Sequence, residues 1–244
     1  MKKILLLFAS LLFISCSINI TDWHKDGLNK KVRVIQDRTF LAELNEEGKI
    51  IKGKEIGGLF VGNQKKYYNK KGLVTEKIIY QDNNIGIDTH KKFEYDKKGI
   101  CIKRIKLDSN GDIWSEHIFK YKKKPNRIEG TWIDVKDKIV LQKDTLLYDK
   151  RGNLIKNGVL SYRYDENNNL IESILVYHGT DHKSITSYSY DSRNIPTKMV
   201  QNTSNREMTR EFAYKLDRNN NWIEKIEYQE GVPKFITERS IQYY

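Results

Sequence analysis

The chain has 244 residues, and its 44 Lys and Arg residues outnumber its 32 Asp and Glu residues, which gives a net charge of +12. A charge of this size is common among proteins that meet nucleic acid, acidic sugars or lipid headgroups. The two cysteines, Cys16 and Cys101, are too few for the disulfide framework that stabilises many small secreted domains.

The first fifteen residues have the pattern of a secretory signal peptide. Lys2 and Lys3 precede the uncharged, mostly apolar residues 4–14, and the small residue Ser15 follows them. A membrane-spanning helix needs about 20 apolar residues, so this segment is too short to remain as an anchor. We therefore expect residues 1–15 to be a signal peptide that is removed on export. An exported protein rarely meets nucleic acid, so we expect no nucleic-acid partner.

The end of this segment contains a candidate lipidation site. Residues 13–16, Phe-Ile-Ser-Cys, resemble the lipobox of bacterial lipoproteins. In that family the cysteine is lipidated and becomes the new amino terminus, so the resemblance implies a lipid on Cys16 and a partner in the membrane. The alternative is an ordinary signal peptide cut near Ser17 or Asn19, which would remove Cys16.

One short pattern recurs through residues 39–244 with a spacing near 26 residues. It is Tyr, then Asp or Asn, two polar residues, and Gly or Asn, and clear copies begin at Tyr68, Tyr95, Tyr148, Tyr164 and Tyr190. Asp or Asn can accept a hydrogen bond from backbone two residues further on, and Gly or Asn tolerates positive φ. Each copy therefore predicts a tight turn. We therefore expect residues 39–244 to form one repeat domain, preceded by a lipidated N-terminus and linker at 16–38.

Apolar residues alternate with polar or small ones before each predicted turn. Examples are Phe93/Tyr95, Tyr188/Tyr190 and Phe212/Tyr214. A period of two is typical of a strand with one buried face. A second apolar run follows each turn, so every repeat predicts a β-hairpin. We predict an all-β fold, an extended antiparallel sheet of tandem hairpins with about sixteen strands, curled or folded over on itself because strands twist.

The repeat carries a resemblance to a known family. The segment Tyr-Asp-Lys-Arg-Gly-Asn-Leu at 148–154 resembles the YD repeat of the Rhs and teneurin families, and residues 221–244 are similar to the ends of lipoproteins from Bacteroidetes-type bacteria. In large Rhs proteins these repeats wind a β shell around a toxin. The resemblance therefore implies a β architecture and a cell-surface location, but no activity.

The residues that carry chemistry are sparse. The sequence has no Gly-rich phosphate loop, no Gly-x-Ser-x-Gly elbow and no His-Glu-x-x-His helix, so we expect neither enzymatic activity nor a cofactor. His178, Asp181 and His182 could together supply three ligands to zinc. Because they fall in a predicted loop, where polar residues are expected in any case, we expect no metal there.

Three tryptophans, Trp114, Trp132 and Trp222, are candidates for ligand binding, because exposed aromatic rings stack on sugars and protein side chains. We expect an exported, lipid-anchored protein of the cell envelope, an outer-membrane lipoprotein facing the periplasm or the surface. Its repeat sheet would be a binding or scaffold surface for a glycan or an envelope protein. The alternatives are a glycan-acting hydrolase, which needs two carboxylates across a cleft, and a structural subunit of a larger envelope complex.

Overall fold

The computed structural model describes residues 21–57, 63–81, 86–122, 127–134, 138–177 and 182–244. Seventeen strands and one four-residue helix, α1 (Asp22–Lys25), make up its secondary structure. The strands are β1 (Val32–Leu44), β2 (Ile50–Ile56), β3 (Gln64–Tyr68), β4 (Val74–Tyr80), β5 (Ile87–Tyr95), β6 (Cys101–Leu107), β7 (Ile113–Lys122), β8 (Arg127–Asp134), β9 (Val140–Tyr148), β10 (Leu154–Asn157), β11 (Leu160–Tyr164), β12 (Leu170–Val176), β13 (Lys183–Tyr190), β14 (Pro196–Thr203), β15 (Arg206–Leu216), β16 (Trp222–Gln229) and β17 (Val232–Tyr243). The all-β prediction is confirmed. Within these ranges no helix is long and apolar enough to cross a membrane.

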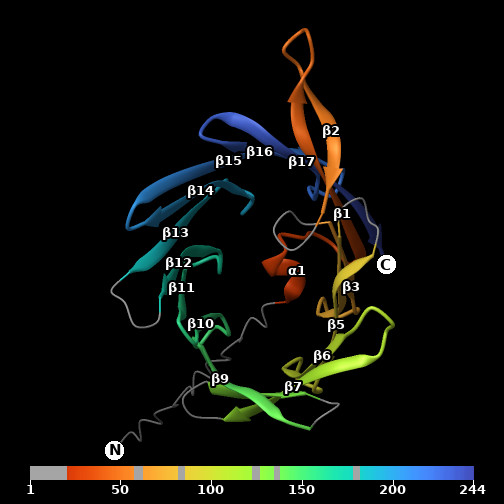
Figure 1. Cartoon of the computed structure of the whole chain (residues 1–244), viewed down its shortest axis with the longest axis vertical. Coiled ribbons are helices and arrows are strands. Elements are labelled where there is room, and N and C mark those ends of the chain that lie inside the picture. The colour runs from red at the N-terminus through yellow and green to blue at the C-terminus, as the bar shows by residue number, and fades with distance from the viewer. Residues whose placement is uncertain (1–20, 58–62, 82–85, 123–126, 135–137, 178–181) are drawn as a thin grey trace, which may run out of the picture.

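The strands close into one antiparallel ring (Figure 1). Each strand from β3 to β17 pairs with the next along the chain, β17 pairs with β1, and the first half of β1 pairs with β3. The ring therefore holds sixteen strands. β2 pairs with the second half of β1, and this hairpin projects beyond the ring. The expected curled sheet is thus a closed β-barrel, which removes the unpaired edges that an open sheet would expose.

The repeat turns gather at one end of the barrel, because alternate turns of an antiparallel ring lie on the same side. They join β3 to β4, β5 to β6, β9 to β10, β11 to β12, β13 to β14 and β15 to β16. We call this end the Asp-turn rim. In the turn after β5, the Asp96 carboxylate accepts hydrogen bonds from the backbone N–H groups of Lys98 and Ile100, both at 2.9 Å. Gly99 then closes the turn with a φ of 82°, as the repeat pattern predicted.

In three of the repeats the tyrosine before the turn, Tyr95, Tyr164 or Tyr190, joins neighbouring hairpins. The Tyr95 hydroxyl donates to the carbonyl of Val74 at 2.7 Å, and the Tyr190 hydroxyl donates to that of Leu170 at 2.8 Å. Val74 and Leu170 are the first residues of β4 and β12. Each of these two strands begins directly after the preceding turn of the Asp-turn rim. Burial raises the pKa of Tyr190 to about 12. In these repeats the Asp shapes the turn and the Tyr attaches it to the previous repeat.

Side chains alternate between the inside and the outside of the barrel wall. On β5, Thr89 and Phe93 face inward, and Phe93 packs against the buried core, whereas Lys92 and Glu94 between and beside them are exposed. The Tyr95 hydroxyl also reaches Asp22, which belongs to the segment inside the ring. The predicted aromatic stripe therefore lines the lumen.

Candidate functional site

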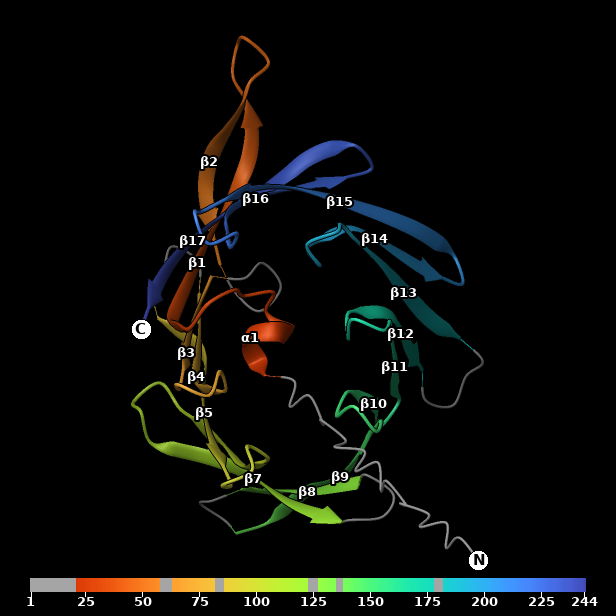
Figure 2. The same cartoon turned by 180° about the vertical axis from the view of Figure 1, so that it is seen from behind.

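The lumen is occupied at the Asp-turn rim by residues 21–31, which we call the plug. Its helix α1 lies inside the ring in both views (Figures 1 and 2). The Trp23 indole N–H donates to the carbonyl of Val32 at 2.8 Å, and the Trp23 ring covers Gly72 so closely that a Cβ there would lie 2.5 Å from it. Leu28 packs into the core with Val32, Ile35, Tyr68 and Val74. The segment expected to be a linker is thus packed into the barrel. The expected domain boundary at residue 39 falls inside β1, because residues 32–38 pair with β17.

Two carboxylates of the plug bind the inner wall. Asp26 accepts hydrogen bonds from the Lys66 ammonium and, at 2.6 Å, from the Tyr68 hydroxyl. Burial raises the pKa of Asp26, but the charge of Lys66 and the two hydrogen bonds outweigh burial and hold this pKa below its usual value. Asp22 accepts a hydrogen bond from the backbone N–H of Val74 at 2.8 Å. The plug is therefore held by charge as well as by packing.

A buried ion pair lies where β1 meets β17. The Arg239 guanidinium donates to both carboxylate oxygens of Asp37, at 2.7 and 2.8 Å, and the two residues are direct cross-strand partners. Gln64 on β3 donates to the same carboxylate at 3.0 Å. The guanidinium carbon of Arg239 lies 3.5 Å from the centre of the Trp222 ring. Both charges are almost fully buried, with side-chain exposures of 6% and 3%, so the pair depends on its mutual hydrogen bonds.

Four lysines face the lumen as successive cross-strand partners, and we call them the lysine row. Lys66 on β3 pairs with Lys77 on β4, Lys77 with Lys91 on β5, and Lys91 with Lys106 on β6. Neighbouring strands are about 4.8 Å apart, so the row spans about 14 Å of the inner wall. The row begins beside the plug, where Lys66 binds Asp26. It ends near the opposite rim, since Lys106 is the last residue but one of β6.

The lysines of this row repel one another. Burial, together with the charge of Lys66, lowers the pKa of Lys77 to about 8. Burial also lowers the pKa of Lys91, helped by Arg104 and Lys106. In the described part of the chain no carboxylate lies within ion-pair distance of Lys77, Lys91 or Lys106. Three cations therefore face the lumen without a countercharge in contact.

Further donors flank the lysine row. Ser115 on β7 is the cross-strand partner of Lys106; it is 1% exposed, and its hydroxyl has no hydrogen-bond partner among the residues that the structure describes. The Arg104 guanidinium lies between the rings of Phe93 and Phe119, at 5.9 and 5.5 Å from their centres, and its buried Nε has no hydrogen-bond partner in the described part of the chain. This part of the lumen offers hydrogen-bond donors and positive charge beside aromatic rings.

The outside of the wall has a different chemistry. Its charged residues form ion pairs between neighbouring strands: Arg163 with Glu172 at 3.1 Å, Lys198 with Glu211 at 3.9 Å, and Lys103 with Glu116. On the same face the His90 Nε2 lies 2.6 Å from the Glu76 carboxylate. These residues sit within the strands and not only at their ends. The outer face is therefore polar along much of the strand length.

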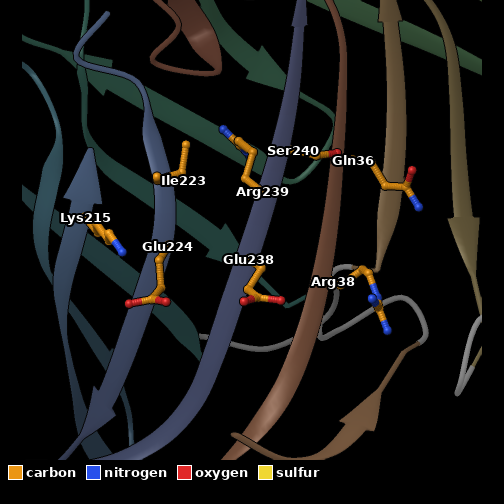
Figure 3. Close-up of a pocket in the computed structure, with 8 residues that line it drawn as sticks. All are labelled: Gln36, Arg38, Lys215, Ile223, Glu224, Glu238, Arg239 and Ser240. Atoms are coloured by element: carbon orange, nitrogen blue, oxygen red, sulfur yellow. The ribbon is translucent and has the colours of Figure 1, made fainter. Parts of the chain in front are cut away.

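An open groove of about 610 Å³ crosses the outside of the wall where β1, β17 and β16 meet (Figure 3). Its lining residues are Gln36, Arg38, Lys215, Ile223, Glu224, Glu238, Arg239 and Ser240. Glu224 and Glu238 are cross-strand partners here. They are the pair of carboxylates in this groove that could be compared with the two carboxylates of a glycan hydrolase. Glu238 is already ion-paired with Lys52 at 2.6 Å. The groove gives no specific support to glycan hydrolysis.

The three candidate tryptophans occupy different settings. Trp114 is 45% exposed, and the Lys106 ammonium lies 4.2 Å from the centre of its ring, so it adjoins the end of the lysine row. The ring of Trp222 is covered by Arg239 and is not open to a ligand on that side. Trp132 belongs to β8, but its side chain lies outside what the structure describes. Trp114 is the candidate that best fits a ligand-stacking role.

The lipidation and metal predictions fall largely outside the described residues. Cys16 precedes residue 21, and His178 and Asp181 lie between residues 177 and 182. His182 is described, and its Nδ1 lies 2.9 Å from the Ser204 hydroxyl. Among the residues that the structure does describe, no group of three His, Cys, Asp or Glu side chains is arranged to hold a metal ion.

Sequence reasoning missed the lysine row, although a signal for it was present. Lys66 precedes Tyr68 by two residues, and Lys91 precedes Phe93 by two, so each shares the inward face of the aromatic stripe. Partners on neighbouring strands could not be assigned before the registers were known. The plug was missed because its contacts with Gly72 and Lys66 join positions more than 35 residues apart.

Comparisons with known proteins give structural likenesses only. No protein-family model matches the chain, and no curated protein matches it. A porin-like protein from Bacteroides uniformis is 11% identical, covering 88% of this chain and 99% of its own, with a TM-score of 0.45. A porin-like protein from Bacteroides vulgatus is 14% identical with the same coverages and a TM-score of 0.42. A TcdB2-TccC3 structure is 15% identical over 78% of this chain and 10% of its own, with a TM-score of 0.34. The resemblance to YD-repeat proteins stays a prediction.

Proposed function

We propose that the protein is an exported, lipid-anchored envelope protein whose barrel stands in water and binds a ligand in its lumen without catalysing a reaction. The observation that carries the proposal is the contrast between the two faces of the wall. Ion pairs such as Arg163–Glu172 cover the outside, whereas aromatic rings line the inside together with lysines that have no ion-pair partner among the described residues. Such an arrangement suits a ligand that enters the barrel, and a wall that faces water.

The charged outer wall argues against a barrel embedded in lipid. An Arg or Lys on the lipid-facing side of a membrane barrel costs about 2–4 kcal/mol at the bilayer midplane. Lys103, Arg163 and Lys198 all lie on the outer face within their strands. A wall that faces water does not carry this free-energy cost. Attachment to the membrane is therefore better provided by a lipid on Cys16.

The Asp-turn rim is the end of the barrel that such an anchor would hold near the membrane. Cys16 precedes Thr21 by five residues, which span at most about 18 Å when extended, and Thr21 lies against Gly72 at this rim. The turns there expose a ring of basic side chains, namely Lys70, Lys71, Lys97, Lys98, Lys150, Arg151, Arg193 and Arg218. Each basic residue near an anionic membrane surface adds about 1 kcal/mol to the free energy of membrane binding, so these side chains would assist a lipid anchor.

A second candidate function, a subunit of a larger envelope complex, is favoured by the opposite rim. Several large apolar side chains there are exposed, among them Ile113, Val140, Val159, Val176 and Val232. Contiguous exposed apolar surface often marks a protein contact. Cross-linking of the full chain in whole cells tests this candidate: a partner that is lost in a Val140→Asp, Val176→Asp variant supports it.

Two measurements on the full chain test the primary proposal. Incorporation of labelled fatty acid is expected in the wild-type chain and not in Cys16→Ala; label retained by the variant contradicts the anchor. In a Cys101→Ser background, Glu172→Cys and Glu211→Cys place single thiols on the outer wall. A membrane-impermeant maleimide is expected to label both equally well before and after detergent is added to membranes. Labelling that requires detergent would show a wall embedded in lipid.

A further inference from the structure

We infer that the lysine row is a binding site for a linear oligoanion, a short chain that carries at least three regularly spaced carboxylate or phosphate groups. Acidic oligosaccharides and polyphosphates are the two sources of this chemistry. The inference rests on the proposed binding role of the lumen and names the ligand class, but it does not depend on the lipid anchor.

The first support is the geometry of the row. Lys77, Lys91 and Lys106 are consecutive cross-strand partners that face the same side of the wall. Two strand spacings place these three charges along about 10 Å. A ligand with one charge at one end, such as a fatty acid, would contact one lysine and leave the others unpaired. A chain with several charges can neutralise all three together.

The second support is that the protein itself places a carboxylate on the first lysine of the row. The Asp26 side chain of the plug accepts hydrogen bonds from Lys66 and Tyr68, so an inward lysine at this register already binds an anion. Lys77 is the next partner along the row and has no carboxylate in ion-pair contact within the described chain. A bound oligoanion would continue the pattern that Asp26 begins.

The third support comes from buried donors beside the row. The hydroxyl of Ser115 and the Nε of Arg104 are buried, and neither has a hydrogen-bond partner among the described residues. Leaving such groups unsatisfied costs free energy, so a ligand that accepts hydrogen bonds from them is favoured. Charge-assisted hydrogen bonds to carboxylate or phosphate oxygens are the strongest available to these donors.

Trp114 lies at the end of the lysine row, and its ring can help to distinguish an acidic oligosaccharide from a polyphosphate. Its ring is 45% exposed and lies 4.2 Å from the Lys106 ammonium. Aromatic rings stack on the apolar faces of sugars, so this position suits an acidic oligosaccharide. A Trp114→Ala variant is therefore expected to weaken oligosaccharide binding and to leave polyphosphate binding unchanged.

Calorimetric titration of the full chain at pH 7 and low salt tests the inference with three probes, a galacturonate pentamer, the neutral maltopentaose and tripolyphosphate. We expect at least one anionic probe to bind and maltopentaose not to bind. A Lys77→Gln, Lys91→Gln, Lys106→Gln variant is expected to bind that probe at least about 100-fold more weakly. The matched control is Lys92→Gln, on the same strand as Lys91 but exposed on the outer face, and its affinity is expected to be unchanged.

The outcomes are distinguishable. Binding of the galacturonate alone assigns the row to acidic sugars, and binding of tripolyphosphate alone assigns it to phosphates; both support the inference. Failure of both anions to bind, or a loss in Lys92→Gln as large as in the triple variant, overturns it. Binding of maltopentaose that survives the triple substitution overturns it too, but leaves the proposed binding role of the lumen standing. If the triple variant does not fold, single Lys91→Gln is compared with Lys92→Gln in its place.

Discussion

Asp37 near the start of the first strand and Arg239 in the last strand form a bidentate ion pair, with hydrogen bonds of 2.7 and 2.8 Å, across the seam that closes the barrel. The residues are 202 positions apart, so the pair joins the first and the last strand of the barrel. Thr39 and Thr237, one inward position further along the same strands, also contact each other, with hydroxyl oxygens 3.2 Å apart. Polar contacts thus specify the register of the closing strands.

Removing one partner of this ion pair is expected to be costly. Arg239→Met leaves the Asp37 carboxylate buried without its main partner, which should lower the free energy of unfolding by about 3–5 kcal/mol. The exposed pair Arg163–Glu172 supplies the control, since Arg163→Met should change this free energy by less than about 1 kcal/mol. Urea denaturation measures both. Equal effects of the two substitutions would show that the seam pair contributes no more than a surface pair.

A comparison of substitutions at Gly72 and Gly152 distinguishes the backbone strain of a turn from the packing of the plug. Both close an Asp-turn-rim turn with positive φ, 80° and 89°, but only at Gly72 would a Cβ meet Trp23, at 2.5 Å. Gly152→Ala should cost about 1–2 kcal/mol from backbone strain alone. Gly72→Ala should cost a further 1–3 kcal/mol, roughly, because Trp23 must move.

The same pair of variants has a structural readout. Gly72→Ala should make the plug susceptible to limited proteolysis near Lys25 and Lys30, whereas Gly152→Ala should leave these sites protected. Equal protection in both variants would mean that the Trp23–Gly72 contact does not hold the plug.

The tyrosine-to-carbonyl bonds should contribute measurably to stability. Tyr190→Phe removes the hydrogen bond to the carbonyl of Leu170, and it should lower the free energy of unfolding by about 0.5–1.5 kcal/mol. Tyr188 on the same strand makes no hydrogen bond through its hydroxyl to a described residue, so Tyr188→Phe should be close to neutral. Thermal denaturation followed by circular dichroism compares them. A neutral Tyr190→Phe would exclude a role for the repeat tyrosine in joining hairpins.

The depressed pKa of Lys77 predicts a specific pH dependence. Its pKa is about 8 in the folded protein, against 10.5 for the ordinary side chain. Between these values the unfolded chain binds more protons, so this group makes stability rise with pH from about 8 to about 10.5. Lys77→Gln should remove this increment and should be more stable than the wild type at pH 7, where the buried charge is unfavourable.

Denaturant titrations at pH 7 and pH 10 check this prediction, with Lys92→Gln as the control. The comparison is made between variants, because the buried tyrosines titrate at high pH in every one of them. A pH dependence that is the same in Lys77→Gln and in the wild type would contradict the burial of a charged Lys77.

The sequence predicted the local structure well, because the signals are local. Asp96 accepts hydrogen bonds from residues two and four positions on, and Gly99 adopts positive φ, so both can be recognised from a five-residue pattern. One turn of the same kind, Asp108–Gly111 between β6 and β7, departs from the Tyr pattern, because Leu107 precedes the Asp.

Closure and the lumen depend on distant residues, so they could not be predicted in the same way. Nothing near Asp37 indicates Arg239 as its partner, and the lysine row exists only when Lys66, Lys77, Lys91 and Lys106 are brought into register. Trp222 is a case in which the residue type alone did not reveal the surroundings of the side chain. Its residue type suggested a ligand platform, but the structure covers its ring with Arg239.

Direct cross-linking of the first and last strands tests barrel closure, on which the lumen and its lysine row depend. Gln36 and Ser240 are cross-strand partners on the outer face, and cysteines at such positions are close enough for a disulfide. In a Cys16→Ala, Cys101→Ser background, oxidised Gln36→Cys, Ser240→Cys protein should form an intramolecular disulfide that shifts its gel mobility. The control pair Gln36→Cys, Ser189→Cys, on strands far apart in the ring, should not. Absence of the first cross-link, or equal formation of both, would contradict a closed barrel.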